Sequence, residues 1–515
     1  MSRSGGFGRG GGLIALAAAC LGVASATSPV AAAPSSAEVV FTDSGPVRGV
    51  VGGDHRVFQG VPYAAPPTRW AAPRPAVPWR EPRDATRPGN ACAQPQAFSP
   101  GSEHEDCLYV NVTTPRLGRA LPVLVWLHGG GFQFGSGAEY GAERMAALGD
   151  VVVVTVNYRL GVFGFLAHPQ LAGSGNYGLA DQQAALRWVR RNAAAFGGDP
   201  GNVTIAGESS GSRSVCGHLV APASQGLFHR AILQSEPCTM TDWPAADGTP
   251  EAEPPGFPRS RQVAERQGEA VAKALGCADV ACLRTKTPAE LLTTTEWFAP
   301  TYGTSLLPID PALAGKVARV PVLHGITRDE YRIADGLNEA FGLPPLTAEQ
   351  YGARVANFVG PDHEAEVLSG YPVTASPSEA WSAVVTDAVF ARPMVDFHRQ
   401  LERRVDTYAY EFADPAAPWM SNLGKPAFPT GAYHTSELQY LFRTANFDEP
   451  LTDGQRVLGD EMIGYWTRFA KTGDPNGHGA PRWRKGEPAH QLAPGSVGPV
   501  DFAARHRYDL WRSIP

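Results

Sequence analysis

The feature that most constrains this chain is the pentapeptide Gly207-Glu208-Ser209-Ser210-Gly211. It matches the G-x-S-x-G pattern, in which a serine stands on a sharp turn between a strand and a helix. A β-branched run precedes it and apolar residues at helical spacing follow it, as that turn requires. A helix beginning at the serine would direct its positive end toward an anion forming there. We therefore expect Ser209 to be a nucleophile; the alternative is a glycine-rich structural turn.

A nucleophilic serine needs a base, usually a histidine that a carboxylate orients. In the G-x-S-x-G fold the order along the chain is serine, acid, histidine, each on a loop after a strand. His434 follows the strand expected at 407–412. The strand expected at 320–323 precedes Asp329 and Glu330, and spacing alone leaves both open as the acid. Other histidines are expected at the surface or in the chain tail, namely His478, His490 and His506.

A glycine-rich stretch, 128–131 (HGGG), comes directly after the strand expected at 123–127. Glycines lack side chains, so their backbone amides can approach a ligand closely and donate to an oxyanion. The alternative is a flexible turn. The position after a strand and upstream of the serine favours the oxyanion hole.

Strand and helix patterns alternate between 123 and 233, which predicts an α/β fold: a large, mostly parallel twisted sheet flanked by helices. Helices are expected at 181–196, 260–275, 377–403 and 461–472. We expect a single domain over 34–515, with helical and loop insertions over the site at about 239–319 and 331–405. Within the first insertion, the Pro-, Gly- and Glu-rich residues 242–258 are expected to form an exposed loop.

Residues 1–33 resemble a secretory signal peptide, with arginines before a short apolar run at 13–23 and small residues near 26 and 33 as cleavage sites. Cys20 offers the alternative of lipoprotein attachment. The apolar run is too short to span a bilayer, so we expect a secreted protein without stable membrane insertion. With a net charge of −6 and no basic tract, nucleic-acid binding is not expected.

Six cysteines lie beyond the expected cleavage sites: Cys92, Cys107, Cys216, Cys238, Cys277 and Cys282. An even count in an exported protein favours disulfides. No C-x-x-C pair and no histidine cluster accompanies them, so neither a metal nor another cofactor is expected.

The chain resembles the type-B carboxylesterases, the carboxylesterase and cholinesterase family of α/β-hydrolases. The matching segments are 58–64 (FQGVPYA), 105–112 (EDCLYVNV), 128–132 (HGGGF), 157–161 (NYRLG), 207–211 (GESSG) and 431–437 (GAYHTSE). The resemblance extends from about residue 40 to the C-terminus. It implies an α/β-hydrolase fold and hydrolysis of carboxylic esters through an acyl-enzyme.

The resemblance assigns the nucleophile to Ser209, the acid to Glu330 and the base to His434. It assigns the oxyanion hole to the backbone amides of Gly130, Gly131 and Ser210. Ser210 stands where the family usually has alanine, an exchange expected to be harmless because the donor is a backbone amide. Tyr331 replaces a common glycine after the acid.

The family also supports disulfides in the regions of Cys92–Cys107 and Cys277–Cys282. Cys216 and Cys238 are expected to pair because one lies two helical turns after Ser209 and the other just after the strand near 231; the alternative is two separate buried thiols. The loop between Cys92 and Cys107 is short, and Phe98 is its only aromatic residue. Cholinesterases use a longer loop here, with an aromatic residue that holds choline by a cation–π contact, so a choline ester is not expected.

The expected function is therefore that of a secreted serine hydrolase acting on small-molecule esters. One alternative is a non-catalytic, cholinesterase-like binding protein, since fold alone does not guarantee chemistry. Another is a lipase, with 242–258 as a lid; Trp243 and Phe257 are its aromatic residues, but several acids lie among them.

Overall fold

The computed structural model describes residues 36–97, 99–313, 317–447, 449–486 and 489–514. The expected signal peptide at 1–33 and Phe98 lie outside the described residues. From Ser36 onward the described residues belong to one compact unit.

A 13-stranded sheet is the main element of that unit, in the order β1-β2-β3-β5-β7-β6-β8-β9-β12-β13-β14-β15, with β4 paired to β2. Pairing is parallel from β7 through β14, and antiparallel between β1, β2, β3, β5 and β7 and between β14 and β15. The strands are β1 Ser36–Phe41, β2 Pro46–Val51, β3 His55–Pro62, β4 Arg83–Asp84, β5 Tyr109–Pro115, β6 Leu121–Leu127, β7 Val152–Val156, β8 Gly198–Glu208, β9 Arg230–Gln234, β12 Val322–Thr327, β13 Thr407–Phe412, β14 His490–Ala493 and β15 Ser496–Pro499. A separate parallel pair joins β10 Arg259–Ser260 and β11 Thr301–Tyr302.

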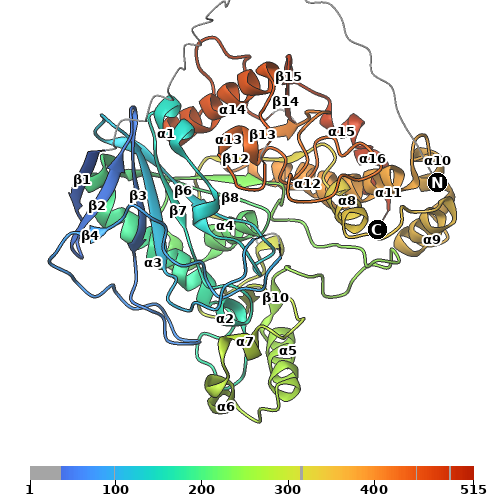
Figure 1. The fold of residues 1–515 in the computed structure, drawn as a ribbon. Helices are drawn as coiled ribbons and strands as arrows, with labels where there is room; N and C mark the ends of the chain where they lie inside the picture. The colour runs from blue at the N-terminus through green and yellow to red at the C-terminus, as the bar shows by residue number, and fades with distance from the viewer. Residues whose placement is uncertain (1–35, 98, 314–316, 448, 487–488, 515) are drawn as a thin grey trace, which may run out of the picture. The chain divides into compact units, whose positions relative to one another are not determined.

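Both faces of the central strands are covered, which explains their nearly continuous apolar sequences. Along β6, Val123 and Val125 enter one apolar core, whereas Leu124 and Trp126 enter another. Helices α3 Tyr177–Asn192 and α4 Ser210–Val220 cover the first face. Helices α1 Glu143–Gly149 and α14 Asp453–Thr472 cover the second (Figure 1). The α/β-hydrolase architecture expected from the sequence is present.

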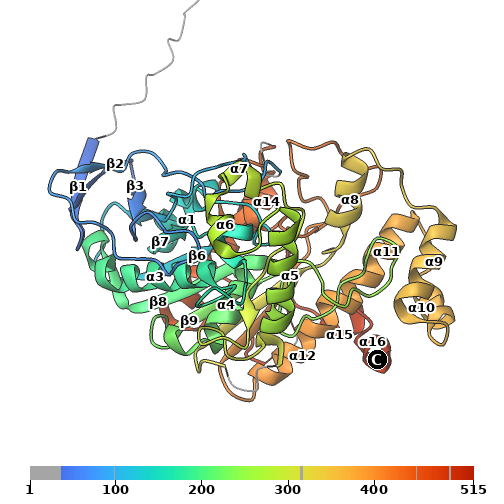
Figure 2. The same cartoon turned by 90° about the horizontal axis from the view of Figure 1, so that it is seen from below.

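The other helices include two groups outside the sheet layers. In both views α5, α6 and α7 lie together, and α8 to α11 form a separate group (Figures 1 and 2). The bounds of the α-helices not yet given are α2 Gly161–Phe165, α5 Arg261–Ala274, α6 Val280–Thr285, α7 Pro288–Leu291, α8 Arg332–Ala340, α9 Ala348–Val359, α10 Glu364–Gly370, α11 Pro377–Val385, α12 Arg392–Leu401, α13 Leu438–Leu441, α15 Phe502–Arg505 and α16 Tyr508–Ser513.

Three expected helices differ in detail. The helix expected at 181–196 begins at Tyr177, and its last turn, Ala193–Phe196, is a 3-10 helix. The helix expected at 377–403 is α11 and α12 joined by a π-helical segment, Thr386–Ala391; Pro393 in the first turn of α12 cannot donate a backbone hydrogen bond. Helix α14 begins before 461 because Thr452 and Gln455 form a capping box at its start.

Burial overturns two surface predictions. The segment 242–258 is not simply an exposed loop, because Phe257 is 6% exposed and the Trp243 ring contacts Tyr331. His490 and His506 are buried rather than at the surface. His506 is held between two carboxylates, an ion pairing over long sequence distances that local patterns do not reveal.

All three expected disulfides are present. Their Cα atoms are 4.9 Å apart in Cys92–Cys107, 5.5 Å in Cys216–Cys238 and 5.4 Å in Cys277–Cys282. The second bond links α4 to the segment after β9.

Candidate active site

Ser209 lies between the end of β8 and the start of α4, with φ 55° and ψ −129°. A non-glycine residue rarely adopts this left-handed conformation, and the surrounding structure must hold it there. The turn is tight: a Cβ atom at Gly211 would lie 2.0 Å from the Leu127 oxygen, and one at Gly207 would lie 2.5 Å from the Gly211 backbone. Larger residues at positions 207 and 211, two residues before and after the serine, would therefore clash with this turn.

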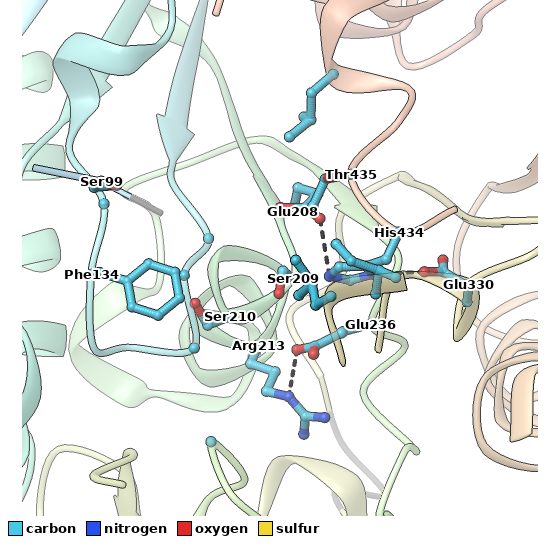
Figure 3. A pocket seen from close by; sticks show the side chains of 18 of the residues that line it. Ser99, Phe134, Glu208, Ser209, Ser210, Arg213, Glu236, Glu330, His434 and Thr435 are labelled. Atoms are coloured by element: carbon cyan, nitrogen blue, oxygen red, sulfur yellow. Dashed lines mark hydrogen bonds and ion pairs between the residues drawn. The ribbon is translucent and has the colours of Figure 1, made fainter. Parts of the chain in front are cut away.

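The loops after β12 and β13 bring Glu330 to His434 (Figure 3). Glu330 Oε2 lies 2.6 Å from His434 Nδ1. Its other carboxylate oxygen accepts a hydrogen bond from the Thr327 amide at 2.8 Å, and its carbonyl accepts one from the His434 amide at 3.2 Å. Glu330 is fully buried. These bonds fix both the carboxylate and the imidazole orientation.

Asp329 points to different partners. Its carboxylate accepts a hydrogen bond from the Ala432 amide at 2.9 Å and pairs with Arg328 and Arg332. Of the two acids that spacing left open, the structure therefore places Glu330, and not Asp329, against the histidine.

Glu208 is a site residue that the sequence analysis did not single out. Its Oε1 lies 3.2 Å from His434 Nε2, so the imidazole stands between two carboxylates (Figure 3). Within the described part of the chain, the Ser209 hydroxyl makes no hydrogen bond. The available signal was an acid directly before the serine, at the C-terminal end of a buried strand.

The electrostatics of the histidine follow from these neighbours. Burial disfavours the imidazolium, but Glu208 and Glu330 favour it more strongly and raise the pKa of His434 to about 10. Burial in turn raises the pKa of Glu208 well above its ordinary value, although His434 acts against that rise. The two groups compete for a proton, and the protonation of either one depends on the other.

The glycine loop faces the start of α4. Gly130 and Gly131 have φ of 99° and 61°, conformations open to glycine. Among the described residues, the amides of Gly130, Gly131 and Ser210 donate to no protein acceptor. Unpaired amides beside Ser209, at the positive end of α4, are suited to receive a negative oxygen.

A cavity of about 430 Å³ opens onto these groups. It combines a few polar groups around Ser209 with many apolar side chains, which is typical of sites for small organic ligands. Its aromatic lining residues are Phe134, Tyr140, Trp243, Phe257, Trp297, Tyr331, Phe390 and Phe447.

Arg213 and Glu236 are two further lining residues that the sequence analysis missed. They form a buried ion pair, and the Arg213 guanidinium lies 3.3 Å from the centre of the Phe257 ring. The pair fixes part of the cavity wall below Ser209 (Figure 3).

In the residues described, no group of three or more His, Cys, Asp or Glu side chains could hold a metal ion. Over the same residues, no helix has the length and apolarity needed to cross a bilayer.

Comparison with known proteins places this geometry in a family. The carboxylesterase family model matches residues 36–493. A para-nitrobenzyl esterase of Bacillus subtilis (strain 168) is 34% identical over 465 residues, covering 85% of this chain and 91% of that protein. A cocaine esterase of Oryctolagus cuniculus is 33% identical over 511 residues, covering 87% and 90%.

Solved structures agree with the sequence match. One described as a thermophylic PNB esterase superposes with a TM-score of 0.74 at 30% identity, covering 92% of this chain and 99% of that chain. The family model matches nearly all of the sheet, and the alignments with the relatives extend over most of each relative's length. These matches define the family. The chain belongs to the carboxylesterase family and is a carboxylic ester hydrolase with the α/β-hydrolase fold.

Proposed function

We propose that Ser209, His434 and Glu330 are the catalytic triad of this esterase. His434 Nε2 removes the Ser209 hydroxyl proton as Oγ attacks the ester carbonyl, and the resulting imidazolium returns that proton to the leaving alcohol oxygen. Water then gives a proton to His434 as it attacks the acyl-enzyme carbonyl, and His434 returns that proton to Ser209 Oγ as the acyl–oxygen bond breaks and the acid leaves. Glu330 stabilises the imidazolium throughout. The observation that carries this proposal is the 2.6 Å contact between Glu330 and His434 Nδ1, with Nε2 directed to the side of Ser209.

The amides of Gly130, Gly131 and Ser210 are proposed as the oxyanion hole. They would stabilise the negative oxygen of both tetrahedral intermediates. These amides have no protein acceptor within the part of the chain that the structure describes, which supports the assignment. His434 Nε2 now lies beside Glu208, so productive attack also requires the Ser209 hydroxyl to replace Glu208 as its nearest partner. Such contacts often tighten only when substrate binds.

Small, largely apolar esters are the proposed substrates, since the cavity measures about 430 Å³ and many aromatic rings line it. Trp243 and Phe257 form part of its wall, which favours small soluble esters over lipid aggregates. The name of the para-nitrobenzyl relative makes aryl and benzyl esters suitable first probes.

Replacing Ser209 tests the mechanism. Ser209→Ala should keep the melting temperature of the wild type and lose about three or more orders of magnitude in kcat on p-nitrophenyl acetate and butyrate. Wild-type turnover by a folded Ser209→Ala protein would overturn the proposal.

We also propose that the protein is exported. The signal-like composition of residues 1–33 and the three disulfides support this, because such bonds persist in oxidising compartments. N-terminal sequencing of protein from the culture medium should find a start at Thr27 or Pro34. Intracellular protein that keeps residues 1–33 would contradict export.

A further inference from the structure

The Ser210 side chain bridges the two sides of the proposed oxyanion hole. Its amide belongs to the start of α4, whereas its hydroxyl oxygen accepts a hydrogen bond from the Phe132 amide at 3.2 Å, at the far end of the glycine loop. Both residues are buried, with exposures of 2% and 0%. Of the described residues, Ser210 alone offers the Phe132 amide an acceptor.

Phe132 has a conformation that needs such support. Its φ is 63°, in the left-handed region that a bulky side chain disfavours, and it follows two left-handed glycines. Backbone strain of this kind persists only where neighbours over-determine the conformation. Here the Phe132 carbonyl accepts a hydrogen bond from the Gly161 amide at 2.7 Å, and its ring packs against Phe165. The amide side depends on Ser210.

The near end of the loop is fixed independently. The Tyr158 hydroxyl donates to the His128 carbonyl at 2.7 Å, and the Tyr158 and His128 rings are stacked with centres 4.4 Å apart. Tyr158 therefore holds the near end of the glycine loop, whereas the Ser210 hydroxyl holds the far end.

We propose that the Ser210 side chain is a positioning residue for ester hydrolysis. It sets the glycine-loop amides against the Ser210 amide, so that all three point to one oxyanion position. This inference rests on the proposed function, because it presumes that these amides are the oxyanion hole. Replacing Ser210 by alanine would keep the backbone amide donor, so the exchange was expected to be harmless. In this chain it should instead lower activity, because alanine leaves the buried Phe132 amide without an acceptor.

Ser210→Ala is the variant that tests this role, with Ser214→Ala as its matched control. Ser214 lies one turn further along α4, is fully buried and accepts a hydrogen bond from Gln182 at 3.0 Å, so its removal also deletes one buried hydroxyl. Alanine is smaller than serine, and it is the usual residue of the family at the position of Ser210. The fold can therefore accommodate it. Melting temperatures would verify that both variants are folded.

The readout separates transition-state binding from substrate binding. We expect Ser210→Ala to lower kcat about tenfold with KM within about twofold, since displacing oxyanion donors costs less than deleting one. A trifluoromethyl ketone forms a tetrahedral oxyanion adduct with a serine nucleophile, and its inhibition constant should rise about tenfold in parallel. Ser214→Ala should stay within about twofold of the wild type in all three constants.

Equal constants for Ser210→Ala and Ser214→Ala would overturn the positioning role, and so would a Ser210→Ala defect confined to KM. Ser209→Ala distinguishes this failure from a failure of the proposed function. If Ser209→Ala is inactive while Ser210→Ala resembles the wild type, only the positioning role fails; if Ser209→Ala is active, the triad itself is wrong.

Discussion

His434 has carboxylates on both sides of its ring, and the two have different geometric relations to it. Glu330 Oε2 lies 2.6 Å from Nδ1 and is itself held by the Thr327 amide, whereas Glu208 lies 3.2 Å from Nε2, the nitrogen needed by Ser209. The first carboxylate can therefore orient the ring, while the second competes with the serine for it. Substitution at each position should change a different kinetic quantity.

Glu330→Gln should lower kcat by about two to four orders of magnitude, because the amide can neither favour the productive tautomer nor stabilise the imidazolium. Asp329→Asn is the adjacent control. It should reduce kcat by less than about tenfold, since Asp329 contacts Arg328, Arg332 and the Ala432 amide rather than the histidine. Steady-state kinetics on one p-nitrophenyl ester would measure both, and the reverse ranking would refute the assignment of the acid.

Glu208→Gln should move the acidic limb of the pH profile of kcat/KM to lower pH. The Glu208 carboxylate favours the imidazolium, so its neutralisation lowers the pKa of His434 and leaves the neutral base available in more acidic solution. Glu236→Gln should shift the limb in the same direction by less, because Glu236 makes a smaller contribution to the same pKa. An unmoved limb, or one moved to higher pH, in Glu208→Gln would contradict this description of the site.

At the scale of elements, the C-terminal helices are tied to the active-site wall through His506. Its Nδ1 lies 2.5 Å from Asp387 in the π-helical segment Thr386–Ala391, and its Nε2 lies 2.7 Å from Glu411 in β13. The same segment carries Phe390, which lines the cavity, and its Thr386 hydroxyl accepts a hydrogen bond from the Tyr331 amide at 3.0 Å. Residues far along the chain therefore support the loop that follows Glu330.

This cluster predicts a loss of stability in alkaline solution. Burial opposes protonation of His506, but Asp387 and Glu411 outweigh it and raise its pKa from 6.5 to about 10. Because the folded pKa is the higher one, the stabilisation is complete below the unfolded pKa and is lost as the pH rises from about 6.5 through about 10. His434, whose pKa is also raised, contributes in the same direction in every variant that retains it.

His506→Gln should therefore melt lower than the wild type at pH 7, by an amount corresponding to about 3 to 5 kcal/mol, and its melting temperature should fall less steeply toward pH 10. The exposed His478 provides a control, since His478→Gln should follow the wild-type curve. Thermal melts from pH 6 to 10 would measure this. Parallel curves for His506→Gln and the wild type would show that the cluster does not stabilise the folded state.

For the whole molecule, the sequence was most informative where chemistry depends on local order. Residue types and their immediate neighbours identify the apolar runs of β6 and β7, the G-x-S-x-G turn and the glycine loop. The alternation of strand and helix patterns along the chain predicts the sheet. The order of serine, acid and histidine was expected from the general pattern of the G-x-S-x-G fold rather than from local sequence, and the catalytic roles of these residues stay predictions. The choice between Asp329 and Glu330 could not be made from spacing, since adjacent side chains differ only in which way the loop turns them.

The sequence was least informative where partners lie far apart along the chain. The His506 cluster, the Arg213–Glu236 pair and the contact of Glu208 with His434 each depend on how separate loops meet. The π-helical segment was hidden because its residues alone suit one continuous α-helix. Burial of Phe257 within a Pro- and Gly-rich segment also has no local sequence signal.

Covalent labelling tests the central claim, that Ser209 is the nucleophile, most directly. The enzyme would be treated with diethyl p-nitrophenyl phosphate, and the residual activity and the peptide masses would be measured on the same samples. We predict one diethylphosphoryl group per chain, on the peptide that contains Ser209, increasing in proportion to the activity lost and absent from Ser209→Ala. Complete inactivation with the label on another residue, or with Ser209 unmodified, would contradict the account.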